Sequence, residues 1–366
     1  MRKKLIAMFL LLSLLLCGCA EITVEYIPLE TDDYMPQTQP TTQEEQLTEG
    51  NLTVHFIDVG QADCALVEAG GEYMLIDGGN RDDGQLVVSY LEQQGVEELA
   101  AVVCTHAHED HVGGLPSVLA VYPTAAVYAP TRTYSSRIFD DFLYYTDQQG
   151  LEVTIPQPGD TMTLGGAELT VLGPVMSYPE PNDTSIVLRL DYGETSFLFT
   201  GDMEKTAEND MLDYWEARGY DNVVSADVLK VGHHCSDTST GYRFLYMVEP
   251  EYGIISCEKN NSYGHPHDEP LSRLMHAGVT CFRTDVLGHV IATSDGREVS
   301  FIWEKQSAQP EGLELGDGMI YIGNKNSKIF HASYCDSLPS KKNQVELESV
   351  KAAMAEGYIP CRSCLG

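Results

Sequence analysis

One short stretch is dense in side chains that bind metal ions. Residues 105–111 follow the apolar run 101–104, and residues 112–116, rich in glycine, follow in turn. A strand ending at residue 104 would place the stretch in the loop at its carboxyl end, before a helix begins. Imidazoles and a carboxylate at this density suit zinc, manganese or iron, whereas calcium prefers oxygen ligands alone. A solvated loop is the alternative, but four spaced ligands argue against it. The candidate ligands are His106, His108, Asp110 and His111.

Two further apolar segments end in residues of the same types. Asp202 follows the apolar residues 196–200, so its carboxylate would lie at the same sheet edge as the histidine cluster. His233 and His234 follow the apolar run 228–231. These segments therefore add one carboxylate and two imidazoles to the candidate site.

Strand-like and helix-like segments alternate around these motifs. The first strands are predicted at 52–59, 64–67 and 73–77, and a helix follows near 84–94. The alternation continues to residue 302, which favours an α/β fold of two mixed sheets between helices. We place the large domain at 51–304, a polar linker at 305–318 and a small module at 319–366.

The charge of the chain bears on its partners. Among 366 residues, 55 are acidic and 22 are basic, which gives a formal net charge of −33. Such a charge repels polyanions at long range, so nucleic acid would have to be held by metals or by local patches. The charge thus argues against a module that grips DNA. It does not argue against a metalloenzyme whose cations hold a phosphate.

The first twenty residues have the pattern of a targeting signal. Basic residues 2–4 precede an apolar run over 5–16, which is short for a transmembrane helix. The following Leu16-Cys17-Gly18-Cys19 is similar to a bacterial lipobox, which implies cleavage before Cys19 and lipid attachment to its thiol. A plain signal peptide is the alternative. We expect a signal peptide over 1–19, a disordered tether over 20–50, and an exported protein anchored by lipid to the outer face of the bacterial cytoplasmic membrane.

The C-terminal module carries its own metal-binding pattern. A His-x3-Cys pair and a distant Cys-x2-Cys pair have the spacing of a tetrahedral structural zinc site. So small a module needs a bound metal ion or another cross-link for stability. Outside the cytoplasm, a disulfide among its cysteines is the alternative. The segment resembles the metal-binding domain of the Ada DNA-repair protein, with a histidine replacing one cysteine. Its candidate zinc ligands are His331, Cys335, Cys361 and Cys364.

The large domain resembles the metallo-β-lactamase superfamily. Within it, the motifs are most similar to the extracellular hydrolase domain of the competence proteins ComEC and Rec2, over roughly residues 51–303. The resemblance implies an αββα sandwich with two divalent metal ions, zinc or manganese. It rests on motifs, in the family's order, at residues 56–63, 106–111, 182–185, 198–202, 229–234 and 263–267.

The resemblance also implies which residue holds which metal. His106 and His108 would bind the first ion, while Asp110 and His111 would bind the second. Asp202 would bridge the two ions, and His234, in preference to His233, would complete the second site. The chain departs from the broader superfamily in one respect, because Asn182 stands where a third histidine of the first site is expected. Cys235, which follows the paired histidines, is expected to pack rather than to bind metal.

Two close cations would lower the pKa of a shared water, so hydroxide would be present at neutral pH. Asp110 would also orient that hydroxide, and His265 or His233 would protonate the leaving group near neutrality. Asp58 or Asp63 is expected to support a ligating histidine. Candidate substrate contacts are Asn182, Ser185, Lys230 and His267, and a surface lysine at a strand end is the equal alternative for Lys230.

We therefore expect a surface-anchored, metal-dependent phosphodiesterase, with nuclease activity on extracellular DNA as the leading hypothesis. Hydrolysis of a small ester or phosphodiester, such as a choline phosphoester, is the alternative among enzymes. A non-catalytic lipoprotein that captures DNA is the alternative outside them. The sequence gives no sign of an obligate protein partner.

Overall fold

A computed structural model describes residues 51–220, 222–312, 321–332, 335, 337–347, 352–353 and 356–361. The expected signal peptide, tether, Cys19 and Cys364 lie outside these residues. Within them, no helix is both long and apolar enough to cross a membrane.

The first sheet of the large domain has eight strands, in the order β15-β14-β1-β2-β3-β4-β5-β6. The strands from β15 to β3 pair antiparallel, and those from β3 to β6 pair parallel. Its strands are β1 (Leu52–Phe56), β2 (Ala65–Ala69), β3 (Glu72–Ile76), β4 (Ala101–Val103), β5 (Val127–Tyr128), β6 (Val153–Thr154), β14 (Val290–Ser294) and β15 (Val299–Trp303).

The second sheet has seven strands, in the order β13-β12-β11-β10-β9-β8-β7. Here β10 to β13 pair parallel, while β7 to β10 pair antiparallel. Its strands are β7 (Thr161–Leu164), β8 (Ala167–Gly173), β9 (Val187–Tyr192), β10 (Thr195–Phe199), β11 (Val228–Lys230), β12 (Tyr252–Ile255) and β13 (Thr280–Arg283).

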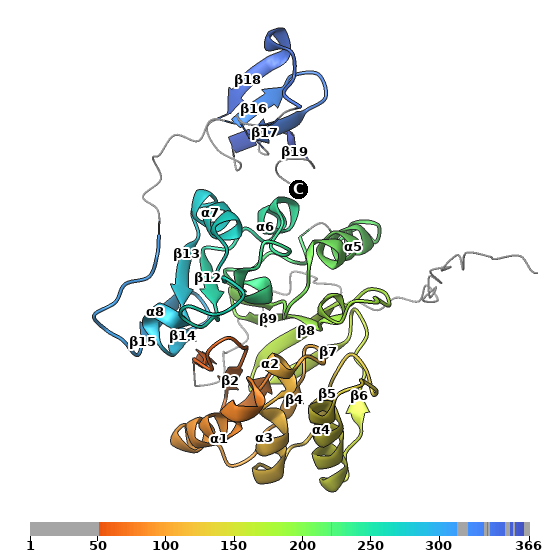
Figure 1. Ribbon diagram of the computed structural model, residues 1–366, viewed down its shortest axis with the longest axis vertical. Helices are drawn as coiled ribbons and strands as arrows, with labels where there is room; N and C mark the ends of the chain where they lie inside the picture. The colour runs from red at the N-terminus through yellow and green to blue at the C-terminus, as the bar shows by residue number, and fades with distance from the viewer. Residues whose placement is uncertain are drawn as a thin grey trace, which may run out of the picture. The chain divides into compact units, whose positions relative to one another are not determined.

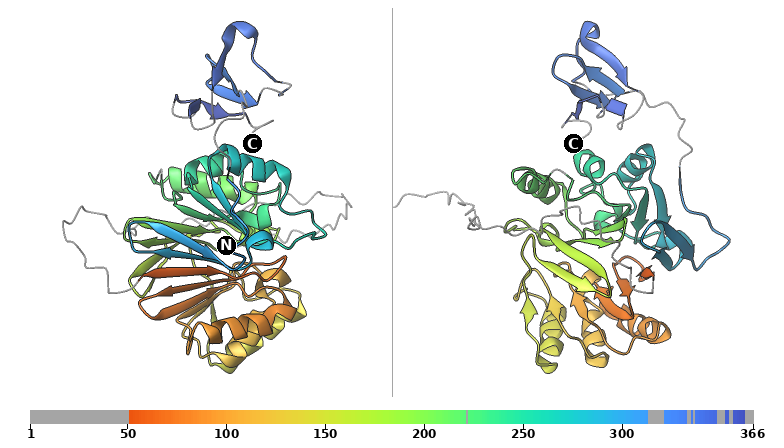
Figure 2. Two further views of the ribbon diagram at one scale, coloured as in Figure 1. Left: turned by 90° about the vertical axis from the view of Figure 1, so that its left-hand side faces the viewer. Right: turned by 180° about the vertical axis from the view of Figure 1, so that it is seen from behind.

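Helices cover the outer faces of both sheets, which gives four layers (Figures 1 and 2). On the first sheet lie α1 (Gly84–Gln93), α3 (Leu115–Val121) and α4 (Arg137–Gln148), and on the second lie α5 (Lys205–Glu216), α6 (Tyr242–Val248) and α7 (Asp268–His276). The architecture is the predicted αββα sandwich. The short helices are η1 (Arg81–Asp83), α2 (Glu109–Val112), η2 (Asn182–Thr184), η3 (Gly232–Cys235) and α8 (Thr284–Leu287).

The main core lies between the two sheets. Val54 and Phe56 of β1 and Phe197 and Phe199 of β10 are buried there because alternate residues of a strand face the same side. The rings of Phe56 and Phe199 stack with centroids 6.1 Å apart. Burial of each such side chain contributes about 1.5–3 kcal/mol, so the sandwich holds the strand ends firmly in place.

The sequence analysis placed the end of this domain at residue 304, but the contacts continue further. The backbone of Glu311 pairs with that of Cys281 in β13. The Glu311 carboxylate accepts a hydrogen bond of 3.0 Å from Nη1 of Arg283. Glu311 therefore pairs with the second sheet, and Lys305 bonds the backbone of Leu287, so contacts with the large domain extend to residue 311.

The C-terminal module contains a four-stranded sheet of its own, in the order β18-β16-β17-β19. Tyr321, Phe330, Leu347 and Tyr358 form a small buried core on it. Its strands are β16 (Tyr321–Asn324), β17 (Ile329–Ala332), β18 (Gln344–Leu347) and β19 (Ile359–Pro360), and the short helix is η4 (Lys341–Asn343).

Candidate metal centre

Four strand ends bring the candidate ligands together. Asp77 follows β3 and the histidine cluster follows its parallel neighbour β4, while Asp202 follows β10 and the paired histidines follow its parallel neighbour β11. Because parallel strands present their carboxyl ends at one edge, each sheet contributes two adjacent loops. The site is built where these edges meet, as the sequence analysis expected.

The loops take unusual backbone conformations to aim the side chains. Asp77, His233 and His234 have φ values of 59°, 49° and 52°, in the left-handed region that residues other than glycine rarely adopt. Gly201 has φ 51°, and a Cβ there would lie 2.9 Å from the side chain of Thr105. Only glycine therefore allows the Asp202 loop to lie this close to the histidine loop.

Asp110, His111, Asp202 and His234 form the tighter of two ligand sets. One ligand atom from each lies within 4.8 Å of all the others. Nε2 of His111 lies 3.2 Å from Oδ1 of Asp202, and Nε2 of His234 lies 3.3 Å from Oδ2 of Asp110. These are the residues that the resemblance assigns to the second metal.

Outer hydrogen bonds hold the two imidazoles of this set. Nδ1 of His111 donates to Oδ2 of Asp77 at 2.8 Å, and Nδ1 of His234 lies 2.9 Å from the carbonyl of Ser256. Oδ1 of Asp63 lies 3.4 Å from the same nitrogen of His234. With Nδ1 occupied in this way, Nε2 of each ring is directed at the site, as is usual for metal-binding histidines. Of the two expected supporting aspartates, Asp63 occupies this position and Asp58 does not.

The residues expected at the first metal gather around the other oxygen of Asp202, Oδ2. Nε2 of His106 lies 3.1 Å from Nδ1 of His108 and 3.9 Å from Oδ2 of Asp202. His233 also faces this oxygen, with its Nε2 at 3.7 Å. Among the described residues, these atoms do not form a set as compact as that of Asp110, His111, Asp202 and His234.

The site is strongly coupled electrostatically. Burial lowers the pKa of His111, but Asp202 and Asp77 outweigh it and raise that pKa well above its ordinary value. Burial likewise opposes protonation of His234, yet Asp202 and Asp63 raise its pKa to about 10. Burial raises the pKa of Asp202, but His111 and His234 bring it well below the usual range.

The residues present fit divalent metal ions. Nε2 of His111, Nε2 of His234 and Oδ1 of Asp202 are buried and make no hydrogen bond within the described chain. Buried polar atoms are rarely left in this way, so their convergence indicates an ion between them. Imidazole nitrogens with carboxylate oxygens suit zinc or manganese.

Two of the expected substrate contacts lie behind the ligands instead. The ammonium of Lys230 is buried, 2.7 Å from Oδ2 of Asp63, so it neutralises that carboxylate and does not reach the pocket. The hydroxyl of Ser185 donates to the carbonyl of Asn182 at 2.7 Å and accepts from the backbone N–H of Asp202 at 3.0 Å. Both side chains therefore position the site, which corrects the expectation of direct contact with substrate.

Of the remaining predicted contacts, Asn182 belongs to the lining of the pocket and His267 does not. Nδ1 of His267 accepts from the backbone of Asp237 at 2.9 Å, and its Nε2 lies 3.2 Å from the carbonyl of Tyr263, so its ring joins two loops. Asn182 lines the pocket, with Nδ2 3.2 Å from Glu204. Cys235 is buried among apolar side chains and packs as expected.

His265 differs from its expected protonation state. Burial, together with His234 and His233, lowers the pKa of His265 to about 4, so its ring is neutral at pH 7. The side-chain amide of Gln61 lies 3.0 Å from its Nδ1. A neutral ring fits a hydrogen-bonding role at the pocket better than the proton donor near neutrality that the sequence analysis expected.

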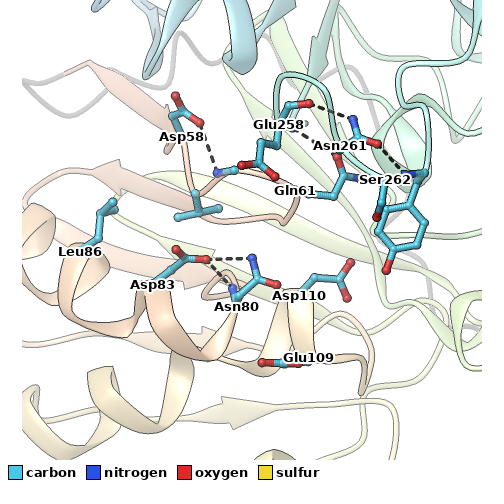
Figure 3. A pocket seen from close by; sticks show the side chains of 13 residues that line it. Asp58, Gln61, Asn80, Asp83, Leu86, Glu109, Asp110, Glu258, Asn261 and Ser262 are labelled. Atoms are coloured by element: carbon cyan, nitrogen blue, oxygen red, sulfur yellow. Dashed lines mark hydrogen bonds between the residues drawn. The ribbon is translucent and has the colours of Figure 1, made fainter.

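A cavity of about 340 Å³ opens over both ligand sets, with Gln61, Glu109 and Tyr263 among its walls. A neighbouring hollow of about 470 Å³ shares these walls and is rich in carboxylates, among them Asp83 and Glu258 (Figure 3). In the described part of the chain, neither lining includes a lysine or an arginine. The approach to the site is therefore acidic.

The C-terminal module holds a separate candidate metal site. His331, Cys335 and Cys361 each offer a ligand atom within 4.8 Å of the others, and all three are buried. Nδ1 of His331 lies 3.4 Å from Sγ of Cys335. Two thiolates and an imidazole suit zinc. Cys364, the expected fourth ligand, lies outside the described residues.

Fold and site together define the class of protein. The model described as the Metallo-beta-lactamase superfamily matches residues 57–258, which is more than half of the chain. The chain belongs to this superfamily. Residues 314–365 match the metal binding domain of Ada, so the chain carries that domain at its C-terminus. The superfamily fold and the His/Asp cluster indicate a metal-dependent hydrolase.

Individual relatives point to the competence proteins. The chain is 30% identical over 258 residues to ComE operon protein 3 of Bacillus subtilis, covering 65% of this chain and 32% of that one. It is 30% identical over 253 residues to Recombination protein 2 of Haemophilus influenzae, covering 67% of this chain and 29% of that one. The chain thus spans about a third of the length of these relatives. Among solved structures, the metallo-beta-lactamase fold protein YhfI of Bacillus subtilis aligns with TM-score 0.45 at 14% identity, covering 69% of this chain and 100% of that one.

Proposed function

We propose that this protein is a two-metal phosphodiesterase that cleaves DNA outside the cytoplasmic membrane. One observation carries the catalytic part of the proposal. Oδ1 of Asp202 faces His111 and His234, while Oδ2 faces His106 and His233. One carboxylate thus lies between two sets of imidazoles, beneath an open pocket. This arrangement suits a pair of divalent ions that share a ligand.

Bound in this site, two divalent ions would supply a nucleophile from water at neutral pH and neutralise charge on the phosphoryl oxygens. The chain would do the rest by positioning. Asp110, which belongs to the tighter ligand set with His111 and His234 and reaches the pocket, is placed to accept the proton of an attacking water. Gln61 fixes the ring of His265, whose N–H would stabilise the phosphate by a hydrogen bond.

Three observations support DNA as the substrate and the cell exterior as the location. The competence relatives include Recombination protein 2. The Ada metal-binding domain adds a module of a DNA-repair type. The expected lipobox at Cys19 would tether the chain to the membrane's outer face. On this proposal, the metal ions hold the phosphodiester, since no basic side chain lines the described pocket.

The acidic approach favours a second candidate, a small phosphodiester whose alcohol part carries a positive charge, such as a choline phosphoester. Asp58, Asp83, Glu109 and Glu258 line the hollow beside the metal site. Carboxylates at this density attract a cation and repel a polyanion.

Assays with four substrates separate the two candidate functions. Purified protein would be incubated with single-stranded DNA, double-stranded DNA, bis-p-nitrophenyl phosphate and p-nitrophenylphosphorylcholine, with Mn²⁺ and Zn²⁺ tested separately. We expect DNA cleavage that is lost in Asp110→Ala. Turnover of the choline ester with intact DNA would transfer the proposal to the small substrate. DNA binding without turnover of any substrate, retained in Asp110→Ala, would indicate capture instead.

A further inference from the structure

The first metal site lacks one of its expected ligands. Among the described residues, His106, His108 and Asp202 gather there, which is one ligand fewer than in the set of Asp110, His111, Asp202 and His234. The structure places another imidazole beside the gap. Nε2 of His233 lies 3.5 Å from Nδ2 of Asn182 and 3.7 Å from Oδ2 of Asp202. We propose that His233 is a ligand of the first metal ion and replaces the missing histidine. This inference rests on the two-metal site of the proposed function, but not on the substrate.

The orientation of His233 matches that of the ligating histidines. Its Nδ1 lies 3.1 Å from the hydroxyl of Thr238 and 3.3 Å from Oε1 of Glu204. The ring is thus held by oxygen atoms on one side while Nε2 faces Asp202. His111 has the same arrangement, with Nδ1 on Asp77 and Nε2 toward Asp202. A carboxylate behind a ligating imidazole fixes its tautomer and increases its basicity.

The distances are those of atoms that could share one ion. Ligands about 2.1 Å from a tetrahedral ion lie about 3.4 Å from one another. The separations within this set are 3.1 Å between His106 and His108, 3.9 Å between His106 and Asp202, and 3.7 Å between His233 and Asp202. The set is less compact than that of Asp110, His111, Asp202 and His234, so side-chain shifts would be needed to bring these atoms to a common ion.

The backbone is also organised to present two imidazoles in different directions. His233 and His234 are neighbours in η3, and both adopt positive φ. Their rings are 6.2 Å apart, and each approaches a different oxygen of Asp202: Oδ2 for His233 and Oδ1 for His234. With Cys235, whose φ is 65°, three consecutive non-glycine residues lie in this costly region, which is the kind of strain that functional sites retain. One strained turn thereby serves both metals.

Asn182 is the competing candidate, because its Oδ1 is buried and makes no hydrogen bond within the described residues. The experiment therefore compares His233→Ala with Asn182→Ala, and with His276→Ala as a matched loss of histidine away from the site. The full chain would be freed of metal, its thiol-containing module loaded with Zn²⁺, and Mn²⁺ then titrated calorimetrically and counted by elemental analysis. Manganese is chosen because thiolates favour zinc over it.

We expect two Mn²⁺ per chain in the wild type and in His276→Ala, and one in His233→Ala, with the spin-coupled electron paramagnetic resonance signal of a manganese pair lost in that variant. Free imidazole should restore the second Mn²⁺ to His233→Ala, since the pocket is open at this residue. Two Mn²⁺ of wild-type affinity in His233→Ala would overturn the inference. Failure of imidazole to restore the second Mn²⁺ to this variant would also overturn it. A single Mn²⁺ in the wild type would also overturn it. Two Mn²⁺ without phosphodiesterase activity would instead refute only the proposed function.

Discussion

Nδ1 of His111 donates a hydrogen bond of 2.8 Å to Oδ2 of Asp77, and both side chains are buried. Asp77 also accepts from the backbone and hydroxyl of Thr105, each at 2.7 Å. One carboxylate therefore joins the end of β3 to the histidine loop and fixes a metal ligand. Its role is to orient the ligand rather than to touch the metal.

Replacement of Asp77 should weaken metal binding without removing a ligand. We expect Asp77→Ala to lower Mn²⁺ affinity of the second site about 10- to 100-fold, the range seen when an outer partner of a ligating histidine is lost. Calorimetric titration measures this, with Asp160→Ala in an exposed turn as the control. Unchanged affinity in Asp77→Ala would show that the hydrogen bond does not orient His111 for metal.

Metal affinity should rise with pH. The pKa of His234 is raised to about 10, so its ring holds a proton at pH 7 when no metal is bound, and the pKa of His111 is also raised well above its ordinary value. A metal ion must displace these protons, so its apparent affinity grows as pH rises from 6 to 9. Titrations in buffers of different ionisation enthalpy measure the released protons. Metal binding without proton release at pH 7 would contradict the raised pKa values.

Replacement of Lys230 tests whether this residue stabilises the fold or contacts the substrate. Its ammonium is buried against Asp63, so Lys230→Met should leave a buried carboxylate unpaired and cost about 3–5 kcal/mol of unfolding free energy. Urea denaturation measures the loss. A variant of wild-type stability with a raised KM would instead restore the expected phosphate contact. The double variant Lys230→Met with Asp63→Leu should recover part of the stability.

The C-terminal module should bind zinc independently of the hydrolase site. Cys361 offers its thiol within 4.8 Å of His331 and Cys335. Cys361→Ser should remove one equivalent of Zn²⁺ per chain and leave the number of Mn²⁺ ions unchanged. Elemental analysis of the full chain checks both values. A disulfide detected by mass spectrometry in the zinc-loaded wild type would contradict a zinc site there.

Much of the site could be predicted because its ligands lie at strand ends with clear apolar patterns. The sequence showed His106 to His111 after one such strand and Asp202 after another, and topology brought them together. Asp77 carried the same signal at the end of β3, but its partner His111 lies 34 residues away, and only the fold reveals that pair. The role of Lys230 was harder to predict, because its position at a strand end suggests an exposed side chain. Its partner Asp63 belongs to the other sheet's loops and buries it.

The local chemistry of single residues was also hidden in the sequence. Nothing in the pair His233-His234 shows that each ring faces a different oxygen of Asp202, because this follows from the strained turn of η3. The low pKa of His265 likewise depends on burial beside both rings. Residue type predicted the chemistry available, and packing decided which atom performs it.

The measurement that tests the central claim most directly compares the wild type with Asp202→Asn in hydrolysis of bis-p-nitrophenyl phosphate during Mn²⁺ titration. Asp202 lies within 3.9 Å of Nε2 of four imidazoles, so its loss should disturb both metals; these are His106, His111, His233 and His234. We predict activity in the wild type that requires Mn²⁺, and a rate more than about 100-fold lower in Asp202→Asn, beyond the effect of losing an outer partner. Asp191→Asn in β9, whose carboxylate pairs with Arg189 at 2.7 Å, serves as the control. Metal-independent hydrolysis, or equal rates in the wild type and Asp202→Asn, would contradict a two-metal phosphodiesterase.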